Sequence, residues 1–476
     1  MINIPFNKTK IIATVGPSSS SKKKLKELIL AGTDVFRLNF SHGTHDDHLK
    51  VLQFIRELND ELNINVCILQ DLQGPKIRLS DVKKGAVIKA GDEFILSIED
   101  FVGDEKKAST TYKNIVNDVK QGDIILMDDG KLELVVKSTN ATEVITEVRH
   151  GGPLKPRKGI NLPYSRVSIP SLTEKDRADL EFGLKHDIEW IALSFVRNVD
   201  DIHELRKLIN DSGKDSRIIA KIEKPEAVEN IDSIIEASDA IMVARGDLGV
   251  EILLEEVPMV QKQIVHKCKK AAKPVIIATQ MMESMIENPR PTRAETNDVA
   301  NAVLDGADSL MLSAETAAGA FPVEVVRTMV NTICSVENKS EKIYYNHYLP
   351  EESSPLFLND TIMLNACQLA KASKSKVITG MTQRGYTAFK LASHRPKAAI
   401  FIFSDNRPFI STMSLIWGVR GIYYNNATST DDTMSDIENI LKEQGYIKSG
   451  DIYVCTASMP IHEKGRTNIV KINEAR

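Results

Sequence analysis

The chain has 476 residues, of which 42% are hydrophobic and 26% charged, so it is neither collagen-like, disordered nor a disulfide scaffold. Its net charge of -4 argues against bulk binding of nucleic acid, and no apolar run approaches the roughly 18 residues that a membrane span needs. Five dispersed cysteines and a start without a secretory pattern are typical of a reduced cytoplasmic protein, and the length predicts about three domains.

Short apolar runs recur along the first two thirds of the chain, with helical patterns between them. Their nearly continuous hydrophobicity is typical of parallel strands that are buried on both faces. This alternation predicts a (β/α)8 TIM barrel, with a doubly wound sheet as the structural alternative. Thr292 and Glu295 have the spacing of a capping box at one helix start. The eight expected strands are 10–14, 35–40, 65–72, 189–196, 217–223, 240–246, 274–280 and 309–315.

The alternation breaks after the third strand, where short alternating segments with turn signals begin. A hairpin at 124–137 turns at Asp128, Asp129 and Gly130, which predicts an inserted all-β lid domain. Without this insert, the remaining chain has about the 250 residues of a plain barrel. A second strand–helix alternation follows a linker and predicts a C-terminal α/β open-sheet domain. The expected domains are the barrel at 1–75 and 171–345, the lid at 76–170 and the C-terminal domain at 346–476.

Polar residues stand at the C-terminal ends of the expected barrel strands. Side chains two residues apart on a strand share a face, so each pair is expected to point into the barrel mouth, where barrel active sites lie. A salt bridge that only closes the mouth explains any single residue equally well, but charged side chains are rarely fully buried, which favours a site. The pairs are Arg37 with Asn39, Lys221 with Glu223, Arg245 with Asp247 and Ser313 with Glu315, with Asp71, Ser194 and Thr279 in equivalent places.

The signs of these charges narrow the chemistry. Glu223 and Asp247 follow consecutive strands and fit a Mg²⁺ ion, or Mn²⁺, although two acids neutralised by Lys or Arg give the same pattern. Arg37, Arg78 and Lys221 supply cations for phosphate or carboxylate groups. A metal with cations around an anionic substrate indicates phosphoryl transfer or enolate chemistry.

Long motifs carry a resemblance to a known family. They are TKIIATVGP at 9–17, FRLNFSHG at 36–43, DLQGPKIR at 71–78, AKIE at 220–223, MVARGDLGVE at 242–251, ATQM at 278–281, PRPTRAE at 289–295 and LSAET at 312–316. In these motifs and in domain order, essentially the whole chain resembles the pyruvate kinases. The resemblance implies Mg²⁺-dependent phosphoryl transfer from phosphoenolpyruvate to ADP, giving pyruvate and ATP in the last step of glycolysis. It also implies a homotetramer.

The resemblance also implies roles for individual residues. Arg37 grips the substrate phosphate, and Lys221 neutralises charge on the transferring group and on the leaving enolate. Glu223 and Asp247 hold Mg²⁺, while the Gly246 backbone and the Thr279 hydroxyl contact the substrate carboxylate. Further matching residues are Asn39, Ser41, His42, Arg78 and Lys158 for the nucleotide and Ser313 and Glu315 for protonation of the enolate. Lys158 lies on the insert that should close as a lid, although a solvated lysine explains it too.

One departure from the family pattern lies at the third strand. Many members hold a monovalent cation at residues matching Asn39, Ser41 and Asp71, with a threonine at position 72 and a glutamate at position 76. This chain has Leu72 and Lys76 there. Our hypothesis is that the Lys76 ammonium replaces K⁺ beside Asp71, so that activity needs no added K⁺. The alternative is a solvent-facing lysine. The pattern resembles the bacterial form that AMP or sugar monophosphates activate.

A loop of the C-terminal domain matches the segment where family members bind a phosphorylated effector. Thr382, Arg384, Gly385 and Thr387 follow an expected strand and precede a helix, and hydroxyls at a helix N-terminus suit an anion. Arg384 stands where a serine is usual. A plain helix-capping turn is the alternative.

Two other functions fit parts of this pattern. One is an aldolase or lyase barrel that acts on phosphoenolpyruvate or pyruvate with Mg²⁺, and the other is a catalytically silent effector-binding scaffold. The lyase would need neither the lid with Lys158 nor Arg78. The presence of Arg37, Lys221 and Glu223 together disfavours the scaffold.

Overall fold

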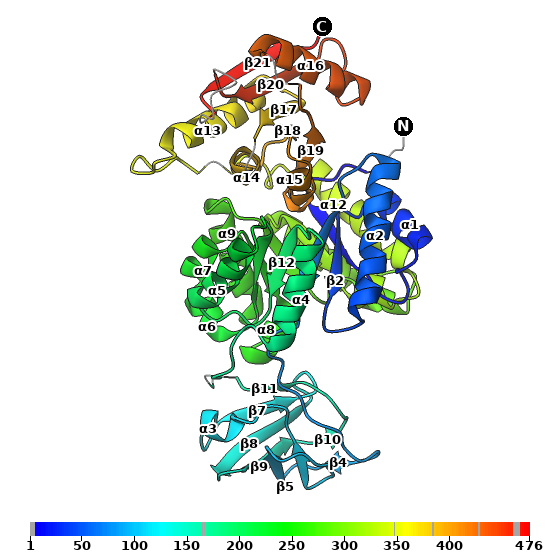
Figure 1. The fold of residues 1–476 in the computed structure, drawn as a ribbon, viewed down its shortest axis with the longest axis vertical. Coiled ribbons are helices and arrows are strands. Elements are labelled where there is room, and N and C mark those ends of the chain that lie inside the picture. Colours follow the sequence, from blue (N-terminus) through cyan, green and yellow to red (C-terminus); the bar gives the residue numbers. More distant parts are fainter. Residues whose placement is uncertain are drawn as a thin grey trace.

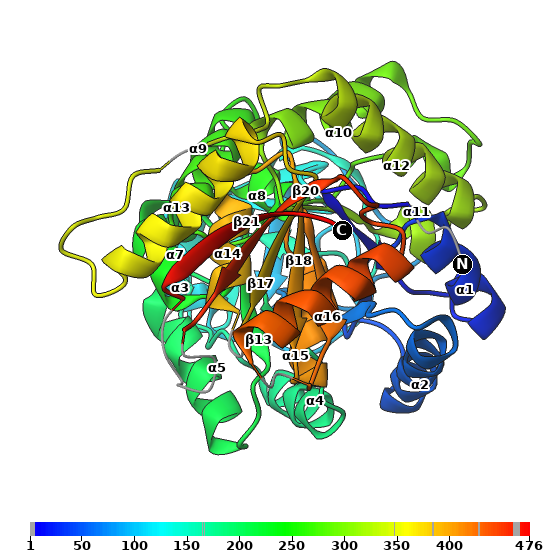
Figure 2. The ribbon, with the colours of Figure 1, turned by 90° about the horizontal axis from the view of Figure 1, so that it is seen from above.

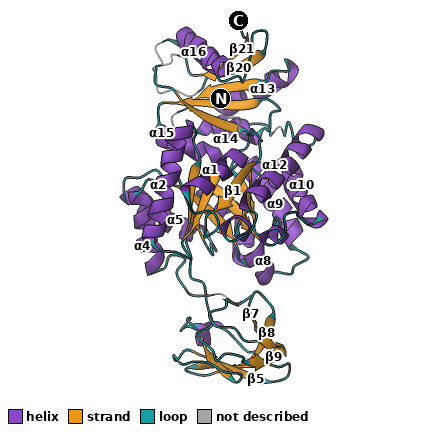
Figure 3. Cartoon of the chain, turned by 90° about the vertical axis from the view of Figure 1, so that its right-hand side faces the viewer, coloured by secondary structure: helices purple, strands orange, loops and turns teal. Residues whose placement is uncertain are grey.

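The computed structural model describes residues 5–163, 165, 167–346, 348–382, 385–426, 429–459 and 467–476. A small β domain, a barrel and a C-terminal sheet follow one another along the long axis of the molecule (Figure 1; Figure 3). None of the helices in these described ranges is long and apolar enough to cross a membrane.

The eight parallel strands close into a barrel in the order β1-β16-β15-β14-β13-β12-β3-β2, which confirms the predicted fold. Several strands end earlier than predicted, and at β14 and β16 the reason is that the chain turns into a helix at the barrel mouth. β14 stops at Ala244, and helix α8 (Arg245–Glu251) begins at the next residue. The strands are β1 (Lys10–Thr14), β2 (Val35–Asn39), β3 (Cys67–Asp71), β12 (Trp190–Leu193), β13 (Arg217–Ile222), β14 (Ala240–Ala244), β15 (Val275–Ala278) and β16 (Ser309–Leu312).

Helices surround the barrel, as the view from the C-terminal domain shows (Figure 2). Their apolar faces pack on the outside of the strands, and each fully buried Leu or Ile contributes about 1.5–3 kcal/mol. Thr292 and Glu295 form the predicted capping box at the start of α10. The helices are α1 (Lys22–Ala31), α2 (His45–Leu62), α4 (Glu174–Lys185), α5 (Val199–Asp211), α6 (Pro225–Glu229), α7 (Ile231–Ala237), α9 (Val257–Lys270), α10 (Arg293–Asp305), α11 (Ala314–Ala317) and α12 (Pro322–Lys339).

The β domain is inserted after β3 and has its own apolar core around Phe94, Leu96 and Leu134. Its main sheet runs in the order β11-β7-β8-β9-β5-β6, and β7 and β8 form the predicted hairpin. Its elements are β4 (Val87–Ile88), β5 (Glu93–Ser97), β6 (Lys107–Ser109), α3 (Ile115–Asp118), β7 (Ile124–Met127), β8 (Leu132–Thr139), β9 (Glu143–His150), β10 (Gly152–Pro153) and β11 (Ile160–Asn161). We call this domain the lid.

The C-terminal domain packs against the barrel end at which the strands begin. Trp190 Nε1 at the start of β12 donates to Thr412 O at 3.1 Å, and Ser309 Oγ of β16 donates to Leu415 O at 3.0 Å. The lid therefore lies at one barrel end and this domain at the other (Figure 1). Its elements are α13 (Phe357–Ala372), β17 (Val377–Met381), α14 (Tyr386–Ser393), β18 (Ala399–Ser404), α15 (Arg407–Thr412), β19 (Val419–Tyr423), α16 (Thr430–Glu443), β20 (Ile452–Ala457) and β21 (Ile469–Glu474).

Candidate active site

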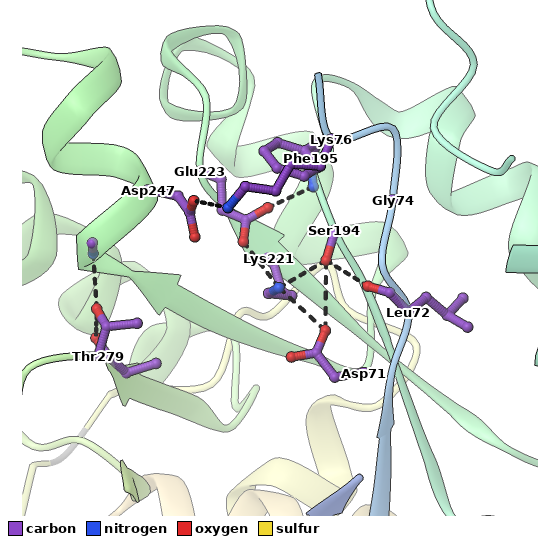
Figure 4. Close-up of polar contacts among 12 residues, drawn as sticks. Asp71, Leu72, Gly74, Lys76, Ser194, Phe195, Lys221, Glu223, Asp247 and Thr279 are labelled. Atoms are coloured by element: carbon purple, nitrogen blue, oxygen red, sulfur yellow. Dashed lines mark hydrogen bonds and ion pairs between the residues drawn. The ribbon is translucent and has the colours of Figure 1, made fainter. Parts of the chain in front are cut away.

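A buried network of charges occupies the barrel mouth at the ends of β2, β3 and β13 (Figure 4). Arg37 Nε lies 2.7 Å from Asp71 Oδ2, and Lys221 Nζ lies 3.1 Å from Asp71 Oδ1. Lys221 Nζ also lies 2.9 Å from Glu223 Oε1. Strand register explains the convergence of β2 and β3, because Asn39 pairs with Asp71 and Arg37 with Leu69. Acidic and basic side chains from separate strands therefore lie together at the barrel mouth, as the sequence predicts.

Mutual pairing favours the charged forms of Lys221 and Asp71 in spite of their burial. Burial alone would lower the pKa of Lys221, but the carboxylates of Asp71 and Glu223 outweigh it and hold the pKa above its ordinary value. Burial would likewise raise the pKa of Asp71, but the charges of Lys221 and Arg37 hold it below its usual range. For Glu223, burial together with the charge of Asp247 raises the pKa.

Ser194 and Phe195 follow β12 and hold the network from the side. Lys221 Nζ donates to Ser194 Oγ at 2.7 Å, and Ser194 Oγ donates to Leu72 O, also at 2.7 Å. The Phe195 N–H donates to Glu223 Oε2 at 2.7 Å, from a backbone with φ of 54°. The sequence predicts Ser194 among the polar residues at the ends of the barrel strands, but it predicts no role for this residue. Phe195 acts through its backbone, for which its residue type carries no signal.

The carboxylates of Glu223 and Asp247 are suited to a divalent cation. Glu223 is fully buried, and among the described residues its Oε1 has no hydrogen-bond partner of good geometry, although Lys221 Nζ is close. The charge of Asp247 acts on Glu223, and Figure 4 shows both carboxylates on the same side of the site. Among the described residues, no group of three or more Asp, Glu, His or Cys side chains is arranged so that it could hold a metal ion. Two carboxylates suffice for Mg²⁺, which keeps waters and takes substrate oxygens.

Helix α8 brings Gly246 to Thr279. The Gly246 N–H donates to Thr279 Oγ1 at 2.8 Å, and a methyl group added at Gly246 would lie 3.4 Å from the same oxygen. Thr279 has φ of 70°, unusual for a β-branched residue. The prediction that Arg245 and Asp247 point the same way was wrong, because both lie on a helix. Arg245 pairs instead with Asp298 at 2.8 Å.

Lys76 does not lie where the hypothesis put it. Its Nζ is 3.4 Å from Asp247 Oδ1, on the chain that leads from β3 into the lid. The partners of Asp71 among the described residues are Arg37, Lys221 and Ser194, so the expected placement beside Asp71 was wrong. Leu72 is buried in the barrel core.

Glu315 and Asn39, which were expected at the enolate and at the nucleotide, accept hydrogen bonds from the backbone of nearby loops. Glu315 is 2% exposed and accepts from the backbone N–H groups of Met282 and Ser313, so it braces the loops that follow β15 and β16. Burial raises its pKa. Asn39 Oδ1 accepts from the N–H of Ser41, which shapes the turn after β2.

The residues expected at the nucleotide lie on two bodies. Asn39, Ser41 and His42 lie on the barrel at the end of β2, and His42 is exposed. Arg78 and Lys158 lie together on the lid, where Arg78 pairs with Gly159 in an isolated β-bridge. Lys158 Nζ lies 3.0 Å from Asp128 Oδ1, so it is paired within the lid while it remains partly exposed.

The expected effector loop precedes α14. Thr382 Oγ1 accepts from the N–H of Gly385 at 3.0 Å, and Gly385 has φ of 92°. Thr387 is buried and its hydroxyl lies 3.4 Å from that of Thr467. Arg384 lies outside the described residues. The contacts of Thr382 suit the capping-turn alternative as well as an anion loop.

Comparisons with known proteins agree over the whole chain. A family model described as pyruvate kinase, barrel domain, matches residues 6–326, and one described as pyruvate kinase, alpha/beta domain, matches residues 360–473. Proteins named pyruvate kinase from Staphylococcus aureus strains MRSA252 and USA300 are 41% identical over 476 residues, with 98% of this chain and 80% of each relative covered. The crystal structure of a pyruvate kinase from Cryptosporidium parvum matches with a TM-score of 0.91 at 35% identity, covering 99% of this chain and 96% of that chain.

Proposed function

The chain belongs to the pyruvate kinase family, and we propose that its barrel-mouth site transfers the phosphoryl group of phosphoenolpyruvate to ADP. The observation that carries this proposal is the position of Lys221 between Asp71 and Glu223, with Arg37 on the far side of Asp71. In this reaction the bond between phosphorus and the enol oxygen breaks, and a bond to the terminal phosphate oxygen of ADP forms. The enolate that leaves then takes a proton and becomes pyruvate.

Each cation in the site has a proposed part in the transfer. Arg37 binds the phosphate of the substrate, and Lys221 neutralises charge that grows on the transferring group and on the enolate oxygen. A divalent cation held by Glu223 and Asp247 would neutralise negative charge on substrate oxygens. Thr279 and the Gly246 backbone orient the carboxylate of the substrate. Ser313 and Glu315 assist the delivery of a proton to the enolate.

The domains divide the remaining tasks. We propose that the barrel at 1–75 and 171–345 carries catalysis, with Asn39, Ser41 and His42 at the nucleotide. The lid at 76–170 brings Arg78 and Lys158 onto the nucleotide when it closes. The domain at 346–476 binds a phosphorylated activator at the loop of Thr382, Gly385 and Thr387. The assembly is a cytoplasmic homotetramer.

We also propose the K⁺-independent, bacterial type of the enzyme. The position of Lys76 supports K⁺ independence, although its ammonium lies 3.4 Å from Asp247 and not beside Asp71. A fixed cation at the rim of the site then supplies the positive charge that K⁺ gives elsewhere. The contact also ties the base of the lid to the same carboxylate that we assign to the metal.

A coupled assay with lactate dehydrogenase tests the main proposal. Pyruvate should form only when phosphoenolpyruvate, Mg²⁺ and ADP are all present, and ATP should form in equal amount. Pyruvate formation without ADP would instead favour a lyase, and no reaction at all would favour a silent scaffold. Rates with a panel of sugar phosphates and AMP, each added alone, identify the activator.

A further inference from the structure

Helix α8 contacts the lid at two points and lies close to it at a third. The lid is joined to the barrel through two segments, 74–78 and 159–163, which we call the stalks. At the first turn of α8, Asp247 Oδ1 lies 3.4 Å from Nζ of Lys76 on the first stalk. Near its end, a methyl group added at Gly130 in the β7–β8 turn would lie 3.9 Å from Val250 Cγ1. At its last residue, Asn161 Nδ2 of β11 donates to Glu251 Oε1 at 2.8 Å. Helix α8, which carries Asp247, is therefore the part of the barrel on which the lid packs.

Glu251 joins the lid to the barrel through a single oxygen. Its Oε1 accepts from Asn161 of the lid and also, at 2.7 Å, from Nζ of Lys224, the residue before α6 on the barrel. The side chain of Glu251 is 1% exposed, and its other oxygen, Oε2, is buried without a hydrogen-bond partner among the described residues. Because Lys224 neutralises the carboxylate whether or not the lid is docked, only the bond to Asn161 depends on lid position.

The two stalks of the lid pack against each other next to α8. A methyl group added at Gly159 would lie 3.4 Å from Lys76 Cε, so the Lys76 stem packs along the segment that carries Asn161. A cleft between the stalks and the barrel is lined by Lys76, Asn161, Phe195, Lys224 and Glu251. Phe195 is the residue whose N–H holds Glu223. The cleft therefore extends from the lid to the residue that holds Glu223.

We infer that Asn161 and Glu251 are positioning residues that dock the lid on α8 and so set the place of Arg78 and Lys158 relative to the barrel. Neither touches the reacting atoms. This inference rests on the proposed function only for its kinetic consequence, because the docking itself is a property of the fold. Loss of the bond should weaken use of ADP, which the lid residues bind, and leave the binding of phosphoenolpyruvate on the barrel unchanged.

Kinetics of Asn161→Ala test the consequence for ADP. Removal of a hydrogen bond to a charged acceptor should raise the KM for ADP about tenfold, with kcat within about twofold. Asn161→Asp should raise the KM further, because it sets a second carboxylate against Glu251. Asn161→Gln, which keeps the amide, should recover part of the loss. The matched control is Asn140→Ala, an exposed lid residue whose side-chain amide donates to Glu143 within its own turn.

Hydrogen exchange tests the docking without any need for activity. In Asn161→Ala, the amides of α8 and of both stalks, 74–78 and 159–163, should exchange several-fold faster than in Asn140→Ala. Equal exchange in the two variants, or an unchanged KM for ADP in an active enzyme, would overturn the inference. A wild-type protein that fails to phosphorylate ADP would refute the proposed function alone, since the exchange result still decides the docking.

Discussion

The ammonium of Lys221 lies 3.1 Å from the carboxylate of Asp71, at the ends of parallel strands β13 and β3, where the Lys221 side chain is 11% exposed and Asp71 is buried. Their attraction holds Lys221 protonated and fixed before any substrate arrives. A preorganised cation of this kind costs no reorganisation when negative charge develops in a transition state.

Lys221→Met should therefore remove most of the turnover. The change keeps the length of the side chain and deletes its charge, so kcat should fall at least about 100- to 1,000-fold. Initial rates in the coupled assay measure this loss. Circular dichroism verifies that the variant is folded, and Lys84→Met, at an exposed lid position, is the matched control. A turnover within tenfold of the wild type would remove Lys221 from the mechanism.

Lys76→Glu should make the enzyme depend on K⁺. The variant sets a carboxylate beside Asp247 in place of an ammonium, so the rim of the site lacks a cation unless one is bound from solution. Rates in KCl are compared with rates in tetramethylammonium chloride at equal ionic strength. We expect the wild type to be equally active in both salts and the variant to be active in KCl only. Strong K⁺ stimulation of the wild type would refute the idea.

The barrel could be predicted because buried parallel strands leave continuous apolar runs, and a break in that pattern marked the lid. The strand ends were less certain, because a polar residue after a strand can continue it or begin a helix. Helix α8 contains Gly246 and Gly249, which are poor helix formers, so its residues carry little helical signal. Residues two apart share a face of a strand, with its period of two, but not of a helix, with its period of 3.6. Arg245 and Asp247 therefore point in different directions.

Contacts made outside regular elements could not be read from spacing. Lys76 lies on a stalk without a repeating period, so the sequence could not decide between Asp71 and Asp247 as its partner. Asn161 and Glu251 are 90 positions apart and meet only because the lid folds back on the barrel. The network of Lys221 could be predicted because its members stand at the ends of neighbouring strands.

Lys8→Met should alter the pH dependence of stability. Lys8 is buried where the N-terminal segment meets the C-terminal domain, and its Nζ donates to Ala398 O at 3.2 Å. Burial lowers its pKa from 10.5 to about 8, against the opposing charge of Glu337. Below pH 8 both folded and unfolded chains carry the proton, and the folded chain bears the full penalty. Between pH 8 and 10.5 the folded chain loses the proton first, so the Lys8 contribution to stability rises with pH.

The size of this effect follows from the difference in pKa, which corresponds to about 3 kcal/mol. Urea unfolding at pH 7.5 and pH 10 measures the stability of Lys8→Met and of the wild type. The advantage of the variant should be greatest at pH 7.5 and should shrink by up to this amount at pH 10. An advantage that does not change with pH would show that Lys8 keeps an ordinary pKa.

Arg395→Met should detach the C-terminal domain from the barrel. The guanidinium nitrogens Nη1 and Nη2 each lie 2.9 Å from one oxygen of Asp308, the residue before β16, and Nη2 also donates to Gly306 O at 2.7 Å. Arg395 is 1% exposed and its guanidinium lies 4.8 Å from the ring of Trp417. Without the arginine, Asp308 loses its buried counter-charge, so the free energy of unfolding should fall by about 3–5 kcal/mol.

A double-mutant cycle separates the ion pair from the loss of packing. Asp308→Asn removes the charge that Arg395→Met leaves unpaired, so the double variant should lose less stability than the sum of the two single variants. Urea unfolding measures each variant. The fluorescence of Trp190 and Trp417, which both lie at this domain contact, follows the contact, and circular dichroism follows the whole chain. Lys397→Met is the control, because the Lys397 pair with Glu341 is exposed and should contribute little. Additive losses would mean that Arg395 stabilises this contact by packing rather than by charge, because Asp308→Asn keeps the shape of the side chain and removes its charge.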